Sequence, residues 1–201
     1  ILVKAELDLD LRELLELAAA QHGDLPKAEG LVDDVLDYML DRFRAWTQDE
    51  GIAVEVYLAV RARPVTRPLD FARRIRAVHA FSQREEAVAL AAANKRVSNI
   101  LSKQQHDGST SVDIGLLQAE AETTLSTALE QCHQAVRPLL DAARYAEALD
   151  VLAQLRGPVD AFFDDVMVMA EDEAVRRNRL ALLASLQSLF LEVADIAQLQ
   201  Q

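Results

Sequence analysis

The sequence contains few residues that end helices, form disulfides or fill large aromatic cores. Among 201 residues there are 6 glycines, 5 prolines and one cysteine, and aromatic side chains make up only 5%. The single cysteine, Cys132, excludes an internal disulfide and a cysteine-rich zinc site, and it fits a reducing, cytoplasmic setting. Because helices tolerate glycine and proline least, the scarcity of both favours a helical protein.

Long apolar runs are also missing. A helix that spans a membrane needs about 20 apolar residues, and charged residues interrupt every stretch of that length. Near the start, Lys4, Glu6, Asp8 and Asp10 break up the apolar residues, which excludes the pattern of a signal peptide. We therefore expect no membrane contact. Since the first residue is Ile1 rather than methionine, we also expect a fragment of a longer chain.

Apolar residues do occur at helical spacing along most of the chain. In the clearest segment, from about Ala28 to Glu50, they recur every three or four positions, and Gly51 then provides a stop. A shorter helix before it is expected to end at Gly23. The same spacing predicts further helices over 54–62, 71–81, 84–103, 116–143 and 145–155, a break at Gly157–Pro158 that starts the next helix, and a last helix that begins near Asp172.

The predicted fold class is all-α, because no credible strand appears between these helices. We treat residues 1–201 as a single helical bundle domain, with 1–62 as an N-terminal helical subregion. The apolar spacing predicts a core that includes Val35, Met39, Phe43, Phe163, Leu183, Leu186 and Phe190.

Charge is distributed unevenly along the chain. The net charge of −12 by itself argues against nucleic acid as a partner. However, residues 61–106 carry 10 basic and 3 acidic side chains, whereas 1–60 carry 5 and 14 and 107–175 carry 3 and 14. Screening limits charge effects to about 8 Å at physiological salt, so the basic block could hold phosphates locally. Equally, it could pair with the acidic flanks or with another subunit.

Two residue pairs have the chemistry of catalytic sites without the arrangement. Cys132 and His133 could act as a nucleophile and its base, but neighbours in a helix point about 100° apart. We therefore expect Cys132 to be a small buried side chain. His106 and Asp107 form a pair of the kind used by metal-dependent phosphohydrolases, but the other histidines show no grouping around it. We expect no catalytic residue and no metal site.

Four segments resemble one protein family. They are DDVLDYMLDRFRAWTQDEG (33–51), RPLDFARRIRAVHAF (67–81), LAAANKRVSNIL (90–101) and the stretch from PVDAFFDD to IAQLQ (158–200). In this order and spacing they resemble the C-terminal region of the β chain of bacterial glycyl-tRNA synthetases. The last stretch is also similar to the helical anticodon-binding domain of arginyl-tRNA synthetases. There an Arg-x-x-Arg-Leu step, here Arg176, Arg179 and Leu180, opens a leucine-rich helix.

The resemblance implies a helical anticodon-binding domain of a larger enzyme. Enzymes of this family are tetramers of two α and two β chains that use ATP and Mg²⁺ to attach glycine to its tRNA. The α chain holds the catalytic motifs, and the β chain contributes tRNA recognition. We therefore expect glycine tRNA, the α chain and a second β chain as partners, with no DNA and no cofactor in this fragment. The alternatives are a module that mainly holds the αβ assembly together and a domain of an arginyl-type synthetase.

The candidate RNA contacts are basic residues, most of them inside these segments: Arg73, Arg76, Lys95, Arg96, Arg176 and Arg179. Arg176 and Arg179 are expected to share a face in the first turns of the last helix, whose N–H groups would also favour phosphate. Arg177 points elsewhere and could brace the fold. Alternatively, these arginines pair with Glu171, Asp172 and Glu173. Asn94, between alanine-rich turns, either binds a ligand or satisfies the backbone.

Glycine anticodons end in two cytosines, and this chemistry suits an acidic domain. The N4 amino group of cytosine is a donor that a carboxylate accepts well. Loop bases are usually read after they splay out, often by stacking on aromatic or arginine planes. The sequence does not identify which carboxylates would read them.

Overall fold

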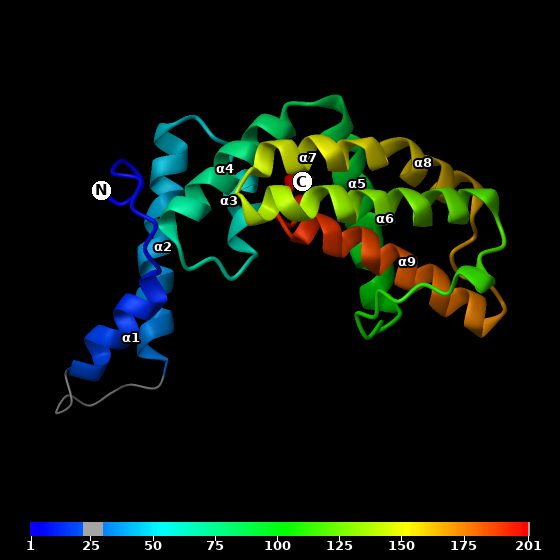
Figure 1. The fold of residues 1–201 in the computed structure, drawn as a ribbon, viewed down its shortest axis with the longest axis horizontal. Coiled ribbons are helices and arrows are strands. Elements are labelled where there is room, and N and C mark those ends of the chain that lie inside the picture. Colours follow the sequence, from blue (N-terminus) through cyan, green and yellow to red (C-terminus); the bar gives the residue numbers. More distant parts are fainter. Residues whose placement is uncertain (22–29, 201) are drawn as a thin grey trace.

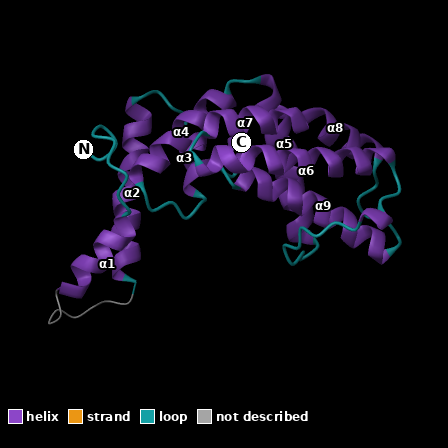
Figure 2. Cartoon of the chain, viewed as in Figure 1, coloured by secondary structure: helices purple, strands orange, loops and turns teal. Residues whose placement is uncertain are grey.

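The computed structural model describes residues 1–21 and 30–200, which form helices and the loops that connect them (Figure 1). No strand occurs within it (Figure 2), which confirms the all-α prediction. The helices are α1 (Leu11–Gln21), α2 (Leu31–Asp49), α3 (Val54–Arg61), α4 (Pro68–Ser82), α5 (Glu85–Lys103), α6 (Glu120–Asp141), α7 (Tyr145–Leu152), α8 (Arg156–Asp165) and α9 (Glu173–Leu191). Three short 3-10 turns accompany them: η1 (Ile114–Leu116), η2 (Ala153–Leu155) and η3 (Ile196–Leu199).

The helices form a body and a projecting hairpin. α1 and α2 pack against each other at one end of the molecule and extend away from the rest (Figure 1). In the body, α6 packs against α7, α8 and α9, while α5 contacts α8, α9 and η3. The C-terminal turn η3 packs against α3 and α5, so the end of the chain lies beside helices from its first half.

Two clusters of buried apolar side chains match this division. The larger cluster extends from Ile52 to Ile196 and includes Phe71, Phe162 and Leu149, all fully buried. The smaller one contains Leu11, Leu36 and Leu40 of the hairpin. Phe43 packs against both clusters, and its ring lies 5.1 Å from that of Phe71 in an edge-to-face arrangement. The division of 1–201 into a domain and the subregion 1–62 stays a prediction.

The predicted core is confirmed in α9 and partly wrong in α2. Leu183, Leu186 and Phe190 are at most 1% exposed. Phe43 and Phe163 are half-buried and pack against the main core. Val35 is only half-buried, and Met39 is 37% exposed, because α2 is covered on one narrow side where Leu36 and Leu40 face inward.

Several predicted boundaries moved for identifiable reasons. α6 begins at Glu120 rather than 116, because Glu122 Oε2 accepts hydrogen bonds from the backbone N–H groups of Gln118 and Ala119 at 2.9 and 2.7 Å and so fixes the start. Gly157–Pro158 does not separate two helices, because both residues belong to α8. Pro158 lies in the first turn of α8, where its missing N–H costs no helical hydrogen bond. Gly51 follows α2 with φ +71°, as a stop requires. The predicted stop at Gly23 and the predicted start at Ala28 lie outside the described residues.

Across 1–21 and 30–200, each helix is too short or too polar to cross a lipid bilayer.

Candidate nucleic-acid interface

The beginning of α9 is capped by its own sequence. Asp172 Oδ1 accepts hydrogen bonds from Ala174 N at 2.8 Å and Val175 N at 3.1 Å, which confirms the predicted N-cap. Because this carboxylate occupies the first free amides and places a negative charge there, the helix end is not open to a phosphate. The expectation that these N–H groups favour phosphate is not supported.

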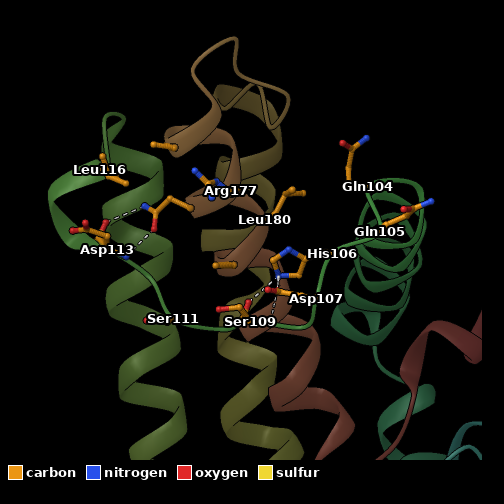
Figure 3. Close-up of a pocket in the computed structure, with 13 residues that line it drawn as sticks. Gln104, Gln105, His106, Asp107, Ser109, Ser111, Asp113, Leu116, Arg177 and Leu180 are labelled. Carbon is orange, nitrogen blue, oxygen red and sulfur yellow. Dashed lines mark hydrogen bonds and ion pairs between the residues drawn. The ribbon is translucent and has the colours of Figure 1, made fainter.

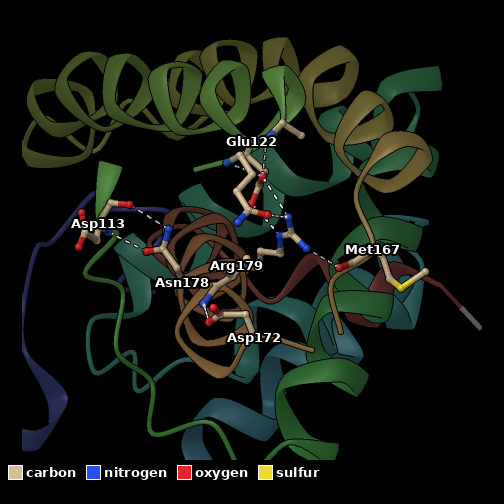
Figure 4. A network of polar contacts seen from close by, with 9 residues as sticks. Asp113, Glu122, Met167, Asp172, Asn178 and Arg179 are labelled. Carbon is tan, nitrogen blue, oxygen red and sulfur yellow. Dashed lines mark hydrogen bonds and ion pairs between the residues drawn. The ribbon is translucent and has the colours of Figure 1, made fainter. Parts of the chain in front are cut away.

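Arg179 lies in the interior, so its predicted place on a basic surface is wrong. The residue is 8% exposed, and its Nε lies 2.7 Å from Oε1 of the fully buried Glu122 (Figure 4). Its Nη1 donates to the Met167 carbonyl at 2.8 Å. Burial alone would raise the pKa of Glu122, but the hydrogen bonds from Arg179 and from two backbone amides outweigh it and lower that pKa. Arg179 therefore joins α6, α9 and the loop after α8.

Asn178, the neighbour of Arg179, fastens another segment to α9. Its Oδ1 accepts from Asp113 N at 2.7 Å, and its Nδ2 donates to Asp113 O at 2.9 Å (Figure 4). Both hydrogen-bonding groups of this 5% exposed amide are thus used on the backbone of one residue. The long connection between α5 and α6 is held at Asp113 as a result.

Arg176 and Arg177 reverse the roles expected from the sequence. Arg176 is half-buried, and its Nη1 donates to the Ala170 carbonyl at 3.0 Å, so it supports the loop before α9. Arg177 is the exposed arginine: 71% of its side chain is accessible, and its one ion pair among the described residues, with Glu173, is 3.9 Å long. A pair so exposed contributes little to stability. The prediction that Arg177 braces the fold is wrong.

Arg177 borders a hollow of about 550 Å³ between the α5–α6 connection and α9 (Figure 3). Leu116, Leu180 and Ala181 contribute apolar side chains to its lining. In Figure 3, Asp113 and Leu116 lie on one side of Arg177, and Leu180, His106 and Asp107 lie on the other. The volume lies within the range of small-molecule sites. A mixed lining of this kind can hold a flat polar ligand with an ionic group.

The arginines of α4 serve different purposes. Arg73 and Arg76 are exposed, and the Arg76 guanidinium lies 5.7 Å from the ring centre of Trp46 in α2. Arg74 instead points inward: it donates to Asp70 Oδ2 at 2.8 Å, to the Tyr145 hydroxyl at 2.9 Å and to the Glu192 carbonyl at 2.6 Å. Burial and the bond that the Tyr145 hydroxyl donates to Asp70 raise the pKa of Tyr145 to about 12. Of the α4 arginines, Arg73 and Arg76 are therefore the ones with an exposed side chain.

On α5, Lys95 and Arg96 are both exposed but are turned to different neighbours. Lys95 Nζ donates to the Gln200 carbonyl at 2.9 Å, and the Arg96 guanidinium stacks 4.2 Å from the ring centre of Phe163 in α8. Asn94 is 2% exposed and donates to the Leu90 carbonyl at 2.9 Å, so it satisfies the backbone. The outer face of Arg96 could stack on a base.

The predicted residues do not form one surface. Arg73 and Arg76 lie on α4 beside the projecting hairpin, whereas the first turn of α9 lies at the opposite end of the body (Figure 1). Other residues of the basic block pair with the acidic flanks, as the alternative interpretation proposed: Arg61 with Asp37 at 2.6 Å, Arg67 with Asp8 at 3.1 Å, and Arg84 with Asp150. The exposed cations thus form separate small groups.

The two residue pairs that could have catalytic chemistry, Cys132–His133 and His106–Asp107, make contacts that support the fold. Cys132 is 6% exposed, its thiol donates to the Val151 carbonyl at 3.8 Å, and burial raises its pKa, so it is the buried side chain that we expected. His106 Nε2 lies 2.8 Å from the Ser109 carbonyl and 3.8 Å from Asp107 Oδ1. Within the described ranges, no three histidine, cysteine or acidic residues group as metal ligands would.

Sequence reasoning missed Arg177 and the hollow, although a signal was present. The buried stripe of α9 contains Val175, Leu182, Leu183 and Leu186. Arg179 falls on this stripe, four residues after Val175 and before Leu183, while Arg177 falls between the stripe positions. The helical periodicity alone would have placed Arg179 inside and Arg177 outside.

Comparison with known families agrees with this architecture. Residues 90–197 match the family described as the DALR anticodon binding domain, which is more than half of the chain. The chain belongs to this family.

Individual relatives carry one shared description, glycine–tRNA ligase beta subunit. The protein of Chromohalobacter salexigens is 98% identical over 201 residues, which are 100% of this chain and 29% of that protein. Those of Marinobacter nauticus and Aeromonas salmonicida are each 54% identical over 200 residues, covering 99% and 100% of this chain and again 29% of the relative. The chain therefore spans less than a third of the length of these relatives.

Proposed function

We propose that this chain is the anticodon-recognition part of a glycine–tRNA ligase β subunit. The observation that carries the proposal is the match of residues 90–197 to the DALR anticodon binding domain within a chain that is 98% identical to such a subunit. The all-helical fold and the exposed cations Arg73, Arg76, Lys95, Arg96 and Arg177 support it. In the whole enzyme this part would bind glycine tRNA in the cytoplasm.

The rest of the enzyme would supply the chemistry. ATP and Mg²⁺ would be used by the catalytic α chain, in a tetramer of two α and two β chains, and this fragment would hold no cofactor. Its own residues would position the anticodon loop through phosphate contacts and base-edge contacts. We expect the purified chain to show no glycine-dependent pyrophosphate exchange; measurable exchange would contradict this division of labour.

The direct test is binding of the 201-residue chain to a glycine tRNA transcript. A second transcript has both anticodon cytosines replaced by uracil and is otherwise identical. We expect binding to weaken by at least about tenfold, because each base-edge contact discriminates by roughly 1–3 kcal/mol. Equal affinity for the two transcripts would overturn anticodon recognition.

A second candidate function, assembly of the α and β chains, has an observation of its own. The hairpin exposes large apolar side chains: Leu14 at 43%, Leu17 at 63% and Leu31 at 44%. Leu14 and Leu17 belong to α1 and Leu31 to α2, and exposed apolar side chains that form a patch are typical of a contact surface. The test is copurification of the α chain with full-length β subunit that carries Leu17→Glu and Leu14→Glu. Loss of the α chain with intact tRNA binding would assign assembly to the hairpin, and unchanged copurification would exclude it.

A further inference from the structure

The hollow beside Arg177 is lined by acidic, basic and apolar residues. We propose that it binds one splayed-out cytosine of the anticodon, with Asp113 accepting from its N4 amino group and Arg177 contacting the adjacent phosphate. This proposal rests on the proposed function and deepens it, because it assigns a specific base, two reading residues and a place on the fold.

Asp113 is held as a fixed acceptor. The side-chain amide of Asn178, which is 5% exposed, accepts from the Asp113 backbone N–H at 2.7 Å and donates to the Asp113 carbonyl at 2.9 Å. Its Oδ1 accepts from Gly115 N at 2.8 Å, which sets the orientation of the carboxylate. Oδ2 accepts no hydrogen bond from the residues that the structure describes. An acceptor fixed in this way loses little conformational entropy when it binds.

The remaining lining is partly apolar. Leu116 is half-buried at one side of the hollow, and Leu180 and Ala181, which are 5% and 3% exposed, form part of its floor. Among the described residues, Arg177 makes one ion pair, the exposed 3.9 Å contact with Glu173, so it can turn to a phosphate without loss of a strong contact there. The volume of about 550 Å³ admits a whole nucleotide rather than a base alone.

The carboxylate also explains how cytosine would be separated from uracil. Cytosine presents an amino donor at position 4, whereas uracil presents an oxygen acceptor there. A carboxylate opposite that oxygen would leave two acceptors facing each other without a proton. Selection would thus come from repulsion of the wrong base as well as from attraction of the right one.

The test measures binding of the 201-residue chain to the glycine tRNA transcript and to two transcripts in which one anticodon cytosine is replaced by uracil. Asp113→Asn keeps the oxygen that accepts from Gly115 but adds an amino donor that uracil can use. We expect the preference for cytosine to fall by about tenfold at one of the two positions and to stay unchanged at the other. The control Asp34→Asn, which removes an exposed carboxylate on α2, should change neither preference.

Arg177→Gln tests the phosphate contact separately. It should weaken binding of all three transcripts alike and lower the slope of log affinity against log salt by roughly 0.7. If the wild-type chain discriminates the anticodons but Asp113→Asn keeps both preferences, the cytosine site is refuted while the proposed function stands. If Arg177→Gln leaves the slope unchanged, the phosphate contact is refuted. A wild-type chain without anticodon preference overturns both the site and the function.

Discussion

Replacement of the buried glutamate Glu122 by glutamine should destabilise the fold far more than its small chemical change suggests. Glu122 is fully buried and accepts four hydrogen bonds: two from Arg179 at 2.7 and 3.3 Å, one from Gln118 N at 2.9 Å and one from Ala119 N at 2.7 Å. In Glu122→Gln, one oxygen becomes an amino group. Whichever way the amide turns, that amino group meets donors, either the guanidinium or the backbone N–H groups.

The magnitude follows from what is left behind. The Arg179 guanidinium would remain buried without its counter-charge, and loss of one partner of a buried ion pair costs about 3–5 kcal/mol. We expect a loss of this size in the free energy of unfolding, measured by urea denaturation followed by circular dichroism. Glu130→Gln is the matched control on the same helix. Glu130 is exposed, and in the part of the chain that the structure describes it accepts one side-chain hydrogen bond, from Gln134, so the change should stay within about 0.5 kcal/mol.

A double variant separates charge burial from shape. Glu122→Leu combined with Arg179→Met removes both charges, so it should lose less stability than Glu122→Gln, although the two backbone amides at the start of α6 would remain unpaired. If Glu122→Gln unfolds within about 1 kcal/mol of the wild-type chain, the pair does not anchor α6 to α9, and our account of Arg179 is wrong.

Three further predictions concern the core and its titratable groups. Leu186→Ala should cost about 2–5 kcal/mol because Leu186 is fully buried, whereas Leu17→Ala in the exposed hairpin should cost within about 0.5 kcal/mol; equal urea midpoints for the two variants would contradict the assigned core. The lowered pKa of Glu122 means that its contribution is present above the ordinary value of 4.5 and is lost as pH falls through the lower folded value. Acid unfolding of Glu122→Gln should therefore depend less on pH in that window than that of the wild type. The Tyr145 hydroxyl should ionise near pH 12 in the folded chain, against the ordinary pKa of 10.0, so its stabilising contribution is full below pH 10 and is lost between the two values. The measurement is an ultraviolet pH titration of the wild-type chain from which the titration of Tyr145→Phe is subtracted. A difference curve with its midpoint at pH 10 would contradict the network with Asp70.

Local spacing was sufficient to predict the helices, because helical periodicity depends on residues three and four apart. The C-terminal core residues Leu183, Leu186 and Phe190 followed from it directly. In α2 the same reasoning placed Met39 inside, yet it is 37% exposed. The apolar stripe of α2 is wider than the surface of α1 and of the body that packs against it. The spacing of apolar residues gives the width of the stripe but not the width of the surface that covers it.

The candidate site was harder to predict because its residues act through distant partners. Arg179 was expected on the surface, but Glu122, its partner, lies 57 positions earlier in the chain. Asn178 and Asp113 are 65 positions apart. Charge counts give the number of cations and not their orientation. They could not separate the half-buried Arg74 and the buried Arg179 from the exposed Arg73 and Arg177.

The distribution of charge suggests how a chain of net charge −12 can bind an anticodon loop. Phosphate contacts need only local cations, since charges more than about 8 Å away are largely screened at physiological salt. Carboxylates near such cations do not simply repel RNA: they can accept from the amino groups of bases, and they exclude bases that present an oxygen instead. Arg177 and the α4 arginines lie at opposite ends of the body, so they form two separate candidate contact areas for RNA. The group whose removal lowers the salt slope would therefore identify the end of the molecule that holds the anticodon, and the site that we propose beside Arg177 corresponds to the start of α9.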